Sequence, residues 1–163
     1  IIEMDKKAKV YLIKDRNKVW YKKLINRLSN NNKYDPKKII FLDPLNYEDY
    51  LLHVGRASVL LDPIYYGAGN SFFESMLFGT PTITLPTDHI KSRLVLGAYK
   101  QMEIADPPIA KNIKDYVDLA VYYANRDDIG KLKKIYREAA EKKLFNTKEA
   151  GEEFNRILLD LFN

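Results

Sequence analysis

One stretch, residues 59–86, restricts the possible fold more than any other part of the chain. It reads VLLDPIYYGAGNSFFESMLFGTPTITLP. The apolar run Val59–Leu61 has the length and composition of a buried parallel strand, and the glycine-rich turn Gly67–Gly69 allows its backbone to approach a ligand closely. Residues 72–78 then have a helical pattern, and residues 81–85 return to strand composition. The stretch therefore predicts one βαβ unit, and the N-terminus of its helix is a potential phosphate site.

The remaining elements extend this unit into a sheet. Strands are predicted at Val10–Ile13, Ile39–Leu42, Val59–Leu61 and Thr82–Leu85. Helical patterns are predicted at residues 17–30, 47–55, 72–78, 90–102, 113–124 and 128–140, followed by a last helix that carries Phe154, Ile157, Leu158 and Leu161. Because helices separate the strands, all four strands are expected to be parallel. The fold class is therefore α/β, a doubly wound, Rossmann-like parallel sheet with extra C-terminal helices, in a single domain that spans residues 1–163.

Composition excludes several classes of protein. The chain has 46% hydrophobic and 30% charged residues and no cysteine, so a disulfide framework, a cysteine-ligated metal site and a thiol nucleophile are all ruled out. It has no apolar run long enough to cross a bilayer, and its N-terminus lacks the pattern of a signal peptide. We therefore expect a cytoplasmic location and no membrane partner. The chain does not begin with methionine, and we expect it to be a fragment of a longer protein.

Three loops should meet at the carboxyl ends of the strands, where open parallel sheets bind ligands. They are Asp43–Asn46, Asp62–Ser71 and Pro86–Ser92. Within the second loop, Gly69, Asn70 and Ser71 would present backbone amides and a hydroxyl to an anion, most plausibly a diphosphate. Glu74 lies one turn further along the helix, where its two carboxylate oxygens could accept hydrogen bonds from the two hydroxyls of a ribose.

Each of these side chains also has a purely structural interpretation. Ser71 and Glu74 have the spacing of a capping box, in which the carboxylate only returns to a backbone amide. Asp62 could be catalytic, or it could fix the turn before Pro63. His53 could pack against its neighbours or contact a ligand. It shares no metal-type spacing with His89, and neither a catalytic triad order nor a Walker lysine motif is present.

Several segments together resemble a known family. FLDPLNYEDYLLHVGRASVLLDP is followed by GAGNSFFESMLFGTPTITLP and by KSR at residues 91–93. This combination resembles the C-terminal catalytic region of the O-linked N-acetylglucosamine transferases, and within them the bacterial and SPINDLY-like branch. These enzymes are inverting glycosyltransferases of the GT-B fold. The resemblance covers roughly residues 39–147.

The resemblance implies a substrate-binding role for eight residues. Gly69, Asn70 and Ser71 match the segment that holds the donor diphosphate, and Glu74 matches the acidic ligand of the ribose. Four further residues match the positions that contact the base and the nucleotide: Leu45, Tyr47, Tyr50 and His53. No catalytic residue, metal ion or other cofactor is implied, since the nucleotide sugar is itself the substrate. This chain departs from animal members in having Gly-Asn-Ser at residues 69–71, where they have His-Thr-Thr, and in lacking basic side chains at two of the nucleotide positions.

The resemblance also implies that this chain is half of an enzyme. The family's C-terminal lobe normally begins with one more strand and helix, and an N-terminal lobe with tetratricopeptide repeats supplies much of the acceptor-protein site. We therefore expect the donor-binding half of a protein O-glycosyltransferase, with UDP-N-acetylglucosamine as the donor and no transfer by the fragment alone.

Two other classes of function stay open at this stage. The first is a non-catalytic module that binds nucleotides or phosphosugars. The second is a scaffold or RNA-contacting domain that uses the first forty residues, which contain 12 Lys and Arg and four Asp and Glu, a net charge of +8. We expect no nucleic-acid partner, because these lysines interleave with apolar residues at helical spacing and are typical of a solvated helix face. Steep salt dependence of binding and indifference to UDP would indicate an RNA-binding domain instead.

Overall fold

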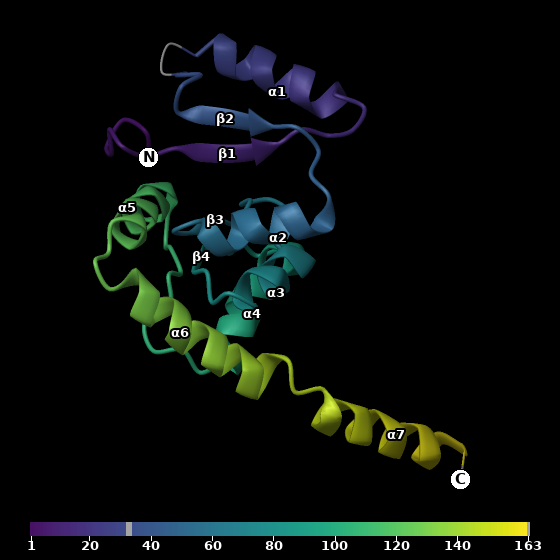
Figure 1. The fold of residues 1–163 in the computed structure, drawn as a ribbon. Helices are drawn as coiled ribbons and strands as arrows, with labels where there is room; N and C mark the ends of the chain where they lie inside the picture. The colour runs from purple at the N-terminus through teal and green to yellow at the C-terminus, as the bar shows by residue number, and fades with distance from the viewer. Residues whose placement is uncertain (32–33, 163) are drawn as a thin grey trace.

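The fold is a mixed α/β arrangement in which strands and helices alternate through the first half and helices alone form the second (Figure 1). The computed structural model describes residues 1–31 and 34–162. Its strands are β1 (Val10–Ile13), β2 (Ile39–Leu42), β3 (Leu60–Leu61) and β4 (Thr82–Ile83). Its helices are α1 (Val19–Ser29), α2 (Tyr47–Arg56), α3 (Asn70–Met76), α4 (Leu94–Gln101), α5 (Ile113–Ala124), α6 (Ile129–Ala139) and α7 (Lys148–Phe162), with a 3-10 turn at Ile90–Ser92 and a π-helical turn at Ala140–Leu144.

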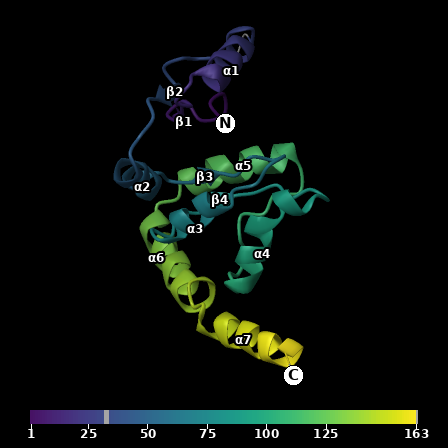
Figure 2. The ribbon, with the colours of Figure 1, turned by 90° about the vertical axis from the view of Figure 1, so that its right-hand side faces the viewer.

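The strands form two separate parallel pairs. β1 pairs with β2 from Val10 opposite Ile39 to Ile13 opposite Leu42, and β3 pairs with β4 through Leu60 and Thr82. The predicted parallel direction is thus confirmed within each pair. The sheet differs from the single one predicted, because in the described residues no ladder joins β1 to β3. The β1–β2 pair and α1 lie apart from the rest of the molecule in both views (Figures 1 and 2).

The buried core lies entirely in the second part of the chain. A first cluster joins α3, α4 and α6 around Phe72, Met76 and Tyr99, each at most 1% exposed. A second cluster packs Ile83 of β4 against Ala120 and other residues of α5. No described residue before Val54 is fully buried, and Trp20 of α1 is 70% exposed. The apolar stripe of α1 predicted from its spacing therefore covers the β1–β2 pair only partly.

Two predicted elements differ in the structure for identifiable reasons. The predicted helix 90–102 is divided into a 3-10 turn and α4 at Arg93, whose backbone angles (φ −112°, ψ 2°) are not helical. The buried Ser92 hydroxyl accepts a hydrogen bond from the Thr87 amide at 3.0 Å, which holds the 3-10 turn against the preceding loop. The predicted strand 82–85 is shortened, since Thr84 leaves the ladder and forms a parallel bridge with Ile109. Asp128 occupies the N-cap position of α6, and its side chain makes no capping hydrogen bond.

The helix α7 extends away from the sheets and the core in both views (Figures 1 and 2). None of its residues is buried, and its apolar side chains include Phe154, which is 61% exposed. Within the described residues, no helix is both long enough and apolar enough to cross a membrane.

Candidate functional site

A glycine turn joins β3 to α3, and the carboxylate of Asp62 fixes it. Asp62 is 2% exposed, and its Oδ1 accepts a hydrogen bond from the Ala68 amide at 2.6 Å. Its Oδ2 accepts a second hydrogen bond, also at 2.6 Å, from the hydroxyl of Thr84 just beyond β4. Burial raises the pKa of this carboxyl above its usual value. Because both carboxylate oxygens are occupied inside the protein, the turn-fixing interpretation of Asp62 is confirmed and a catalytic role is not supported.

The start of α3 lacks a side-chain cap. Gly69 occupies the N-cap position, and no side chain accepts a hydrogen bond from the first amides of the helix. The capping box between Ser71 and Glu74, the structural alternative at these residues, is therefore absent. Asn70 is exposed, whereas Gly69 and Ser71 are half-buried. The anion-binding role of these residues stays a prediction, and the Glu74 side chain is available for another partner.

Glu74 faces α2 rather than the start of its own helix. Its carboxylate lies near the phenol of Tyr50, across the contact between α2 and α3. Burial and, to a lesser extent, the nearby Glu74 carboxylate raise the pKa of Tyr50 to about 12. The ring of Tyr47 lies 6.5 Å from the ring of Tyr50. Three of the residues predicted to contact the nucleotide therefore form one continuous polar and aromatic surface between the two helices.

The other predicted residues of α2 lie at its start and along the same helix. Asn46 caps α2 by accepting a hydrogen bond from the Asp49 amide at 2.8 Å, and this places the half-buried Leu45 just before the first turn. His53 lies two turns from the cap. It is exposed, and its ring is 6.5 Å from that of Tyr11 on β1. The His53 ring therefore lies where α2 meets the β1–β2 pair, and its contact with the nucleotide stays a prediction.

Residues outside the predicted site fix α2 and α3 relative to one another. Lys133 of α6 donates hydrogen bonds from its Nζ to the carbonyls of Gly55 and Ala57 at the end of α2, at 2.8 and 2.6 Å. Its own carbonyl lies against Gly79, which ends α3 with φ +67° and leaves no room for a Cβ. The sequence marks Gly79 as a helix end. It has no local signal for Lys133, whose role depends on a contact between distant segments.

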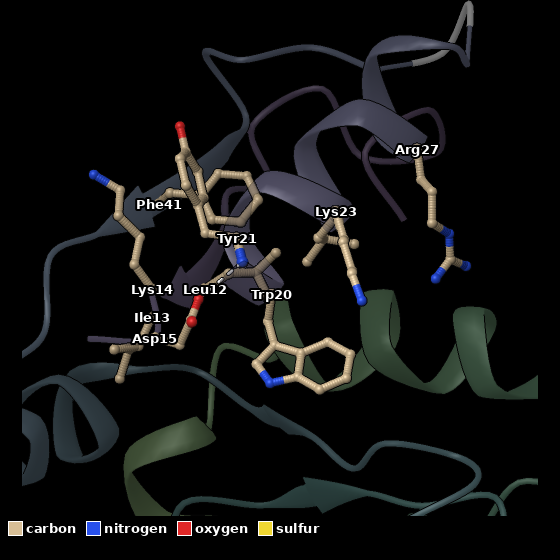
Figure 3. Close-up of a pocket in the computed structure, with 10 residues that line it drawn as sticks. Leu12, Ile13, Lys14, Asp15, Trp20, Tyr21, Lys23, Arg27 and Phe41 are labelled. Carbon is tan, nitrogen blue, oxygen red and sulfur yellow. Dashed lines mark hydrogen bonds between the residues drawn. The ribbon is translucent and has the colours of Figure 1, made fainter. Parts of the chain in front are cut away.

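A hollow lies elsewhere, between β1 and α1 (Figure 3). It has a volume of about 480 Å³ and contains none of the eight predicted site residues. Its lining is formed by Leu12, Ile13, Lys14, Asp15, Trp20, Tyr21, Lys23, Leu24, Arg27 and Phe41. Lys14 at its edge forms an ion pair with Asp43 at 2.9 Å. Within the described ranges, no group of three His, Cys, Asp or Glu residues could hold a metal ion.

Parallel strand pairs, with a glycine turn leading from β3 into α3, define a Rossmann-like α/β domain. The chain belongs to glycosyltransferase family 41, because the model of that family matches residues 9–154. The O-glycosyltransferase resemblance inferred from the sequence and the α/β fold class are both confirmed by this match and by a solved structure.

That structure is a point mutant of the O-GlcNAc transferase of Thermobaculum terrenum. It superposes with a TM-score of 0.79 at 17% sequence identity. The match covers 98% of this chain and 32% of the other, so this chain spans about a third of the length of that protein. At this identity the likeness establishes the fold.

Proposed function

We propose that this chain is the donor-nucleotide half of an inverting protein O-glycosyltransferase and binds a UDP-sugar, with UDP-N-acetylglucosamine as the donor. The family match supports the class of reaction. The contact between Glu74 and Tyr50, beside the uncapped start of α3, carries the assignment of the site. It joins two residues that the family resemblance assigns separately to the nucleotide.

In this proposal the chain supplies binding and charge stabilisation rather than a base. Amides at Gly69–Ser71 hold the diphosphate and stabilise it as it leaves the sugar, without a metal ion. Glu74 accepts hydrogen bonds from the ribose, with Tyr50 fixing its carboxylate. Leu45 and Tyr47 bracket the uracil at the start of α2, and His53 contacts the nucleotide from the second turn.

The proposal is tested by calorimetric titration of UDP into the chain and into Glu74→Ala. The substitution should weaken binding by roughly 1–3 kcal/mol, the contribution of hydrogen bonds to a charged group. Glu138→Ala on α6 is the matched control, since that carboxylate is exposed and pairs with Lys134 of the same helix at 3.8 Å. Equal UDP affinity for parent and Glu74→Ala, with both folded, would remove the ribose role from Glu74.

We further propose that the chain alone does not transfer sugar. It comprises a single lobe, and a second lobe with tetratricopeptide repeats would hold the acceptor protein, in the cytoplasm. Orientation of two substrates can contribute about 7–11 kcal/mol to a transfer reaction, and one wall of a cleft cannot supply it. UDP should therefore bind with a dissociation constant on the order of 0.1–1 mM. Transfer from labelled UDP-N-acetylglucosamine to protein by this chain alone would refute the proposal.

A further inference from the structure

The segment after β4 lies directly along the glycine turn. The Gly67 amide donates a hydrogen bond to the Lys91 carbonyl at 2.9 Å. A Cβ on Gly67 would lie 2.8 Å from that oxygen and 3.3 Å from the Cα of Ser92, and a Cβ on Gly69 would lie 3.8 Å from the Leu94 side chain. Residues 91–94 and the turn are therefore in close backbone contact, which fixes the position of Lys91 beside the proposed diphosphate site.

The side chain of Lys91 carries an accessible positive charge at this position. Its Nζ lies 5.9 Å from the centre of the Tyr66 ring, and both side chains are exposed. None of the ion pairs within residues 1–31 and 34–162 involves Lys91. Arg93, two residues further on, donates from its guanidinium to the Thr87 carbonyl at 3.0 Å. Lys91 is thus held to the turn by its backbone and by an aromatic ring.

The sequence adds a second observation about charge. Three of the loops at the carboxyl ends of the strands, residues 43–46, 62–71 and 86–92, contain one Lys or Arg in total, which is Lys91. The loop after β1 adds Lys14, Arg16 and Lys18, and Lys14 pairs with Asp43. Glu74, one turn into α3, adds a carboxylate close to the turn. A diphosphate bound at Gly69–Ser71 would therefore meet neutral amides and an acidic group, with one cationic side chain within the loops 43–46, 62–71 and 86–92 to balance its charge.

We propose that Lys91 supplies the cationic contact to the donor diphosphate, and that the Tyr66 ring holds its ammonium at the turn before the donor binds. This inference rests on the proposed function. A phosphate is the stronger partner, because a charge-assisted contact between an ammonium and an anion exceeds an exposed cation–π contact. Lys91 would therefore move from the ring to the ligand when the donor binds. Its role is selection of diphosphate-bearing ligands over the bare nucleoside.

The experiment compares the parent chain with Lys91→Met and Lys91→Arg, and uses Lys100→Met as the control. Lys100 is exposed in the last turn of α4, so its substitution removes the same charge away from the turn. Binding of UDP, uridine and inorganic pyrophosphate is measured by NMR titration, with the Gly67–Ser71 amides as reporters. Far-UV circular dichroism and urea unfolding check that all variants fold.

We expect Lys91→Met to bind UDP and pyrophosphate about tenfold more weakly and uridine with unchanged affinity. Lys91→Arg should stay within about threefold of the parent, and Lys100→Met should match it. If the parent binds UDP and Lys91→Met binds it equally well, the role of Lys91 is refuted while the proposed function stands. If pyrophosphate binding depends on Lys91 but neither UDP nor uridine shifts the α2 amides, the anion site stands and the nucleotide proposal falls. If the parent binds neither UDP nor pyrophosphate, both are refuted.

Discussion

Removal of the Asp62 carboxylate should loosen the glycine turn and destabilise the protein. In Asp62→Ala, the Ala68 amide and the Thr84 hydroxyl each lose a hydrogen bond of 2.6 Å, and both residues are buried. A hydrogen bond to a charged group contributes about 1.5–3 kcal/mol, and an unsatisfied buried donor costs a similar amount. The desolvation that raises the pKa of Asp62 is relieved in the variant and offsets part of this loss. We expect a net loss of about 2–4 kcal/mol in the free energy of unfolding.

The isosteric variant Asp62→Asn separates the hydrogen bonds from the charge. Its carbonyl oxygen can still accept from the Ala68 amide, and its NH₂ group can donate to the Thr84 hydroxyl, which accepts as well as donates. This variant should therefore recover more than half of the stability lost in Asp62→Ala. It should also keep the hydrogen bond between Gly67 and Lys91, which Asp62→Ala is expected to weaken.

Urea unfolding followed by circular dichroism measures the difference in free energy between the three proteins. Amide hydrogen exchange at Gly67 and Ala68 reports on the turn itself, because local opening exposes these amides without global unfolding. A loss below 1 kcal/mol in Asp62→Ala, or an Asp62→Asn variant no more stable than Asp62→Ala, would show that these two hydrogen bonds do not fix the turn.

Two further predictions concern the helices that form the site. Gly79→Ala should destabilise the protein by at least about 3 kcal/mol, because alanine at φ +67° is strained and its Cβ would overlap the Lys133 carbonyl. The control is Gly97→Ala in α4, where a Cβ meets open space and should not destabilise the protein. Equal stability of the two variants would contradict the prediction. Tyr50 should lose its proton near pH 12 rather than 10, as the absorbance difference at 295 nm between the parent and Tyr50→Phe would show. Because its folded pKa lies above the unfolded value, its contribution to stability is complete below about pH 10 and is lost as the pH rises towards 12.

Local sequence signals predicted the elements that are locally determined. The helix predicted at residues 47–55 is observed at Tyr47–Arg56, because the Asn46 cap and the apolar spacing both lie within the segment. The segment 90–102 was predicted less well. Its break lies at Arg93, whose backbone is not helical and whose guanidinium donates to the Thr87 carbonyl, and no residue pattern within the segment predicts this break.

The candidate site shows the same division between local and long-range information. The glycine turn and the start of α3 were predictable from residues 67–72, since the turn depends on neighbouring glycines. The spacing of Ser71 and Glu74 also predicted a capping box, which is absent because α3 begins at Asn70 and Ser71 lies inside the helix. The role of Lys133 depends on the carbonyls of Gly55 and Ala57, and the position of Lys91 depends on the Gly67 amide. In both cases the partner is far away in the sequence. The spacing of residues within one segment cannot predict contacts between such distant residues.

The division of the strands into two pairs has a consequence for how the chain unfolds. The unit formed by β1, α1 and β2 has no fully buried residue among those described. It meets the rest of the chain where the rings of Tyr11 and His53 lie 6.5 Å apart, and the segment before β1 is held by a 2.8 Å hydrogen bond from Asn125 to Asp5. Its amides should therefore exchange with solvent through sub-global opening, at a lower free energy than the amides of α3 and α4. Heat or denaturant would then release two units in succession, and a melting temperature read from the core would describe only the part of the chain that begins with α2.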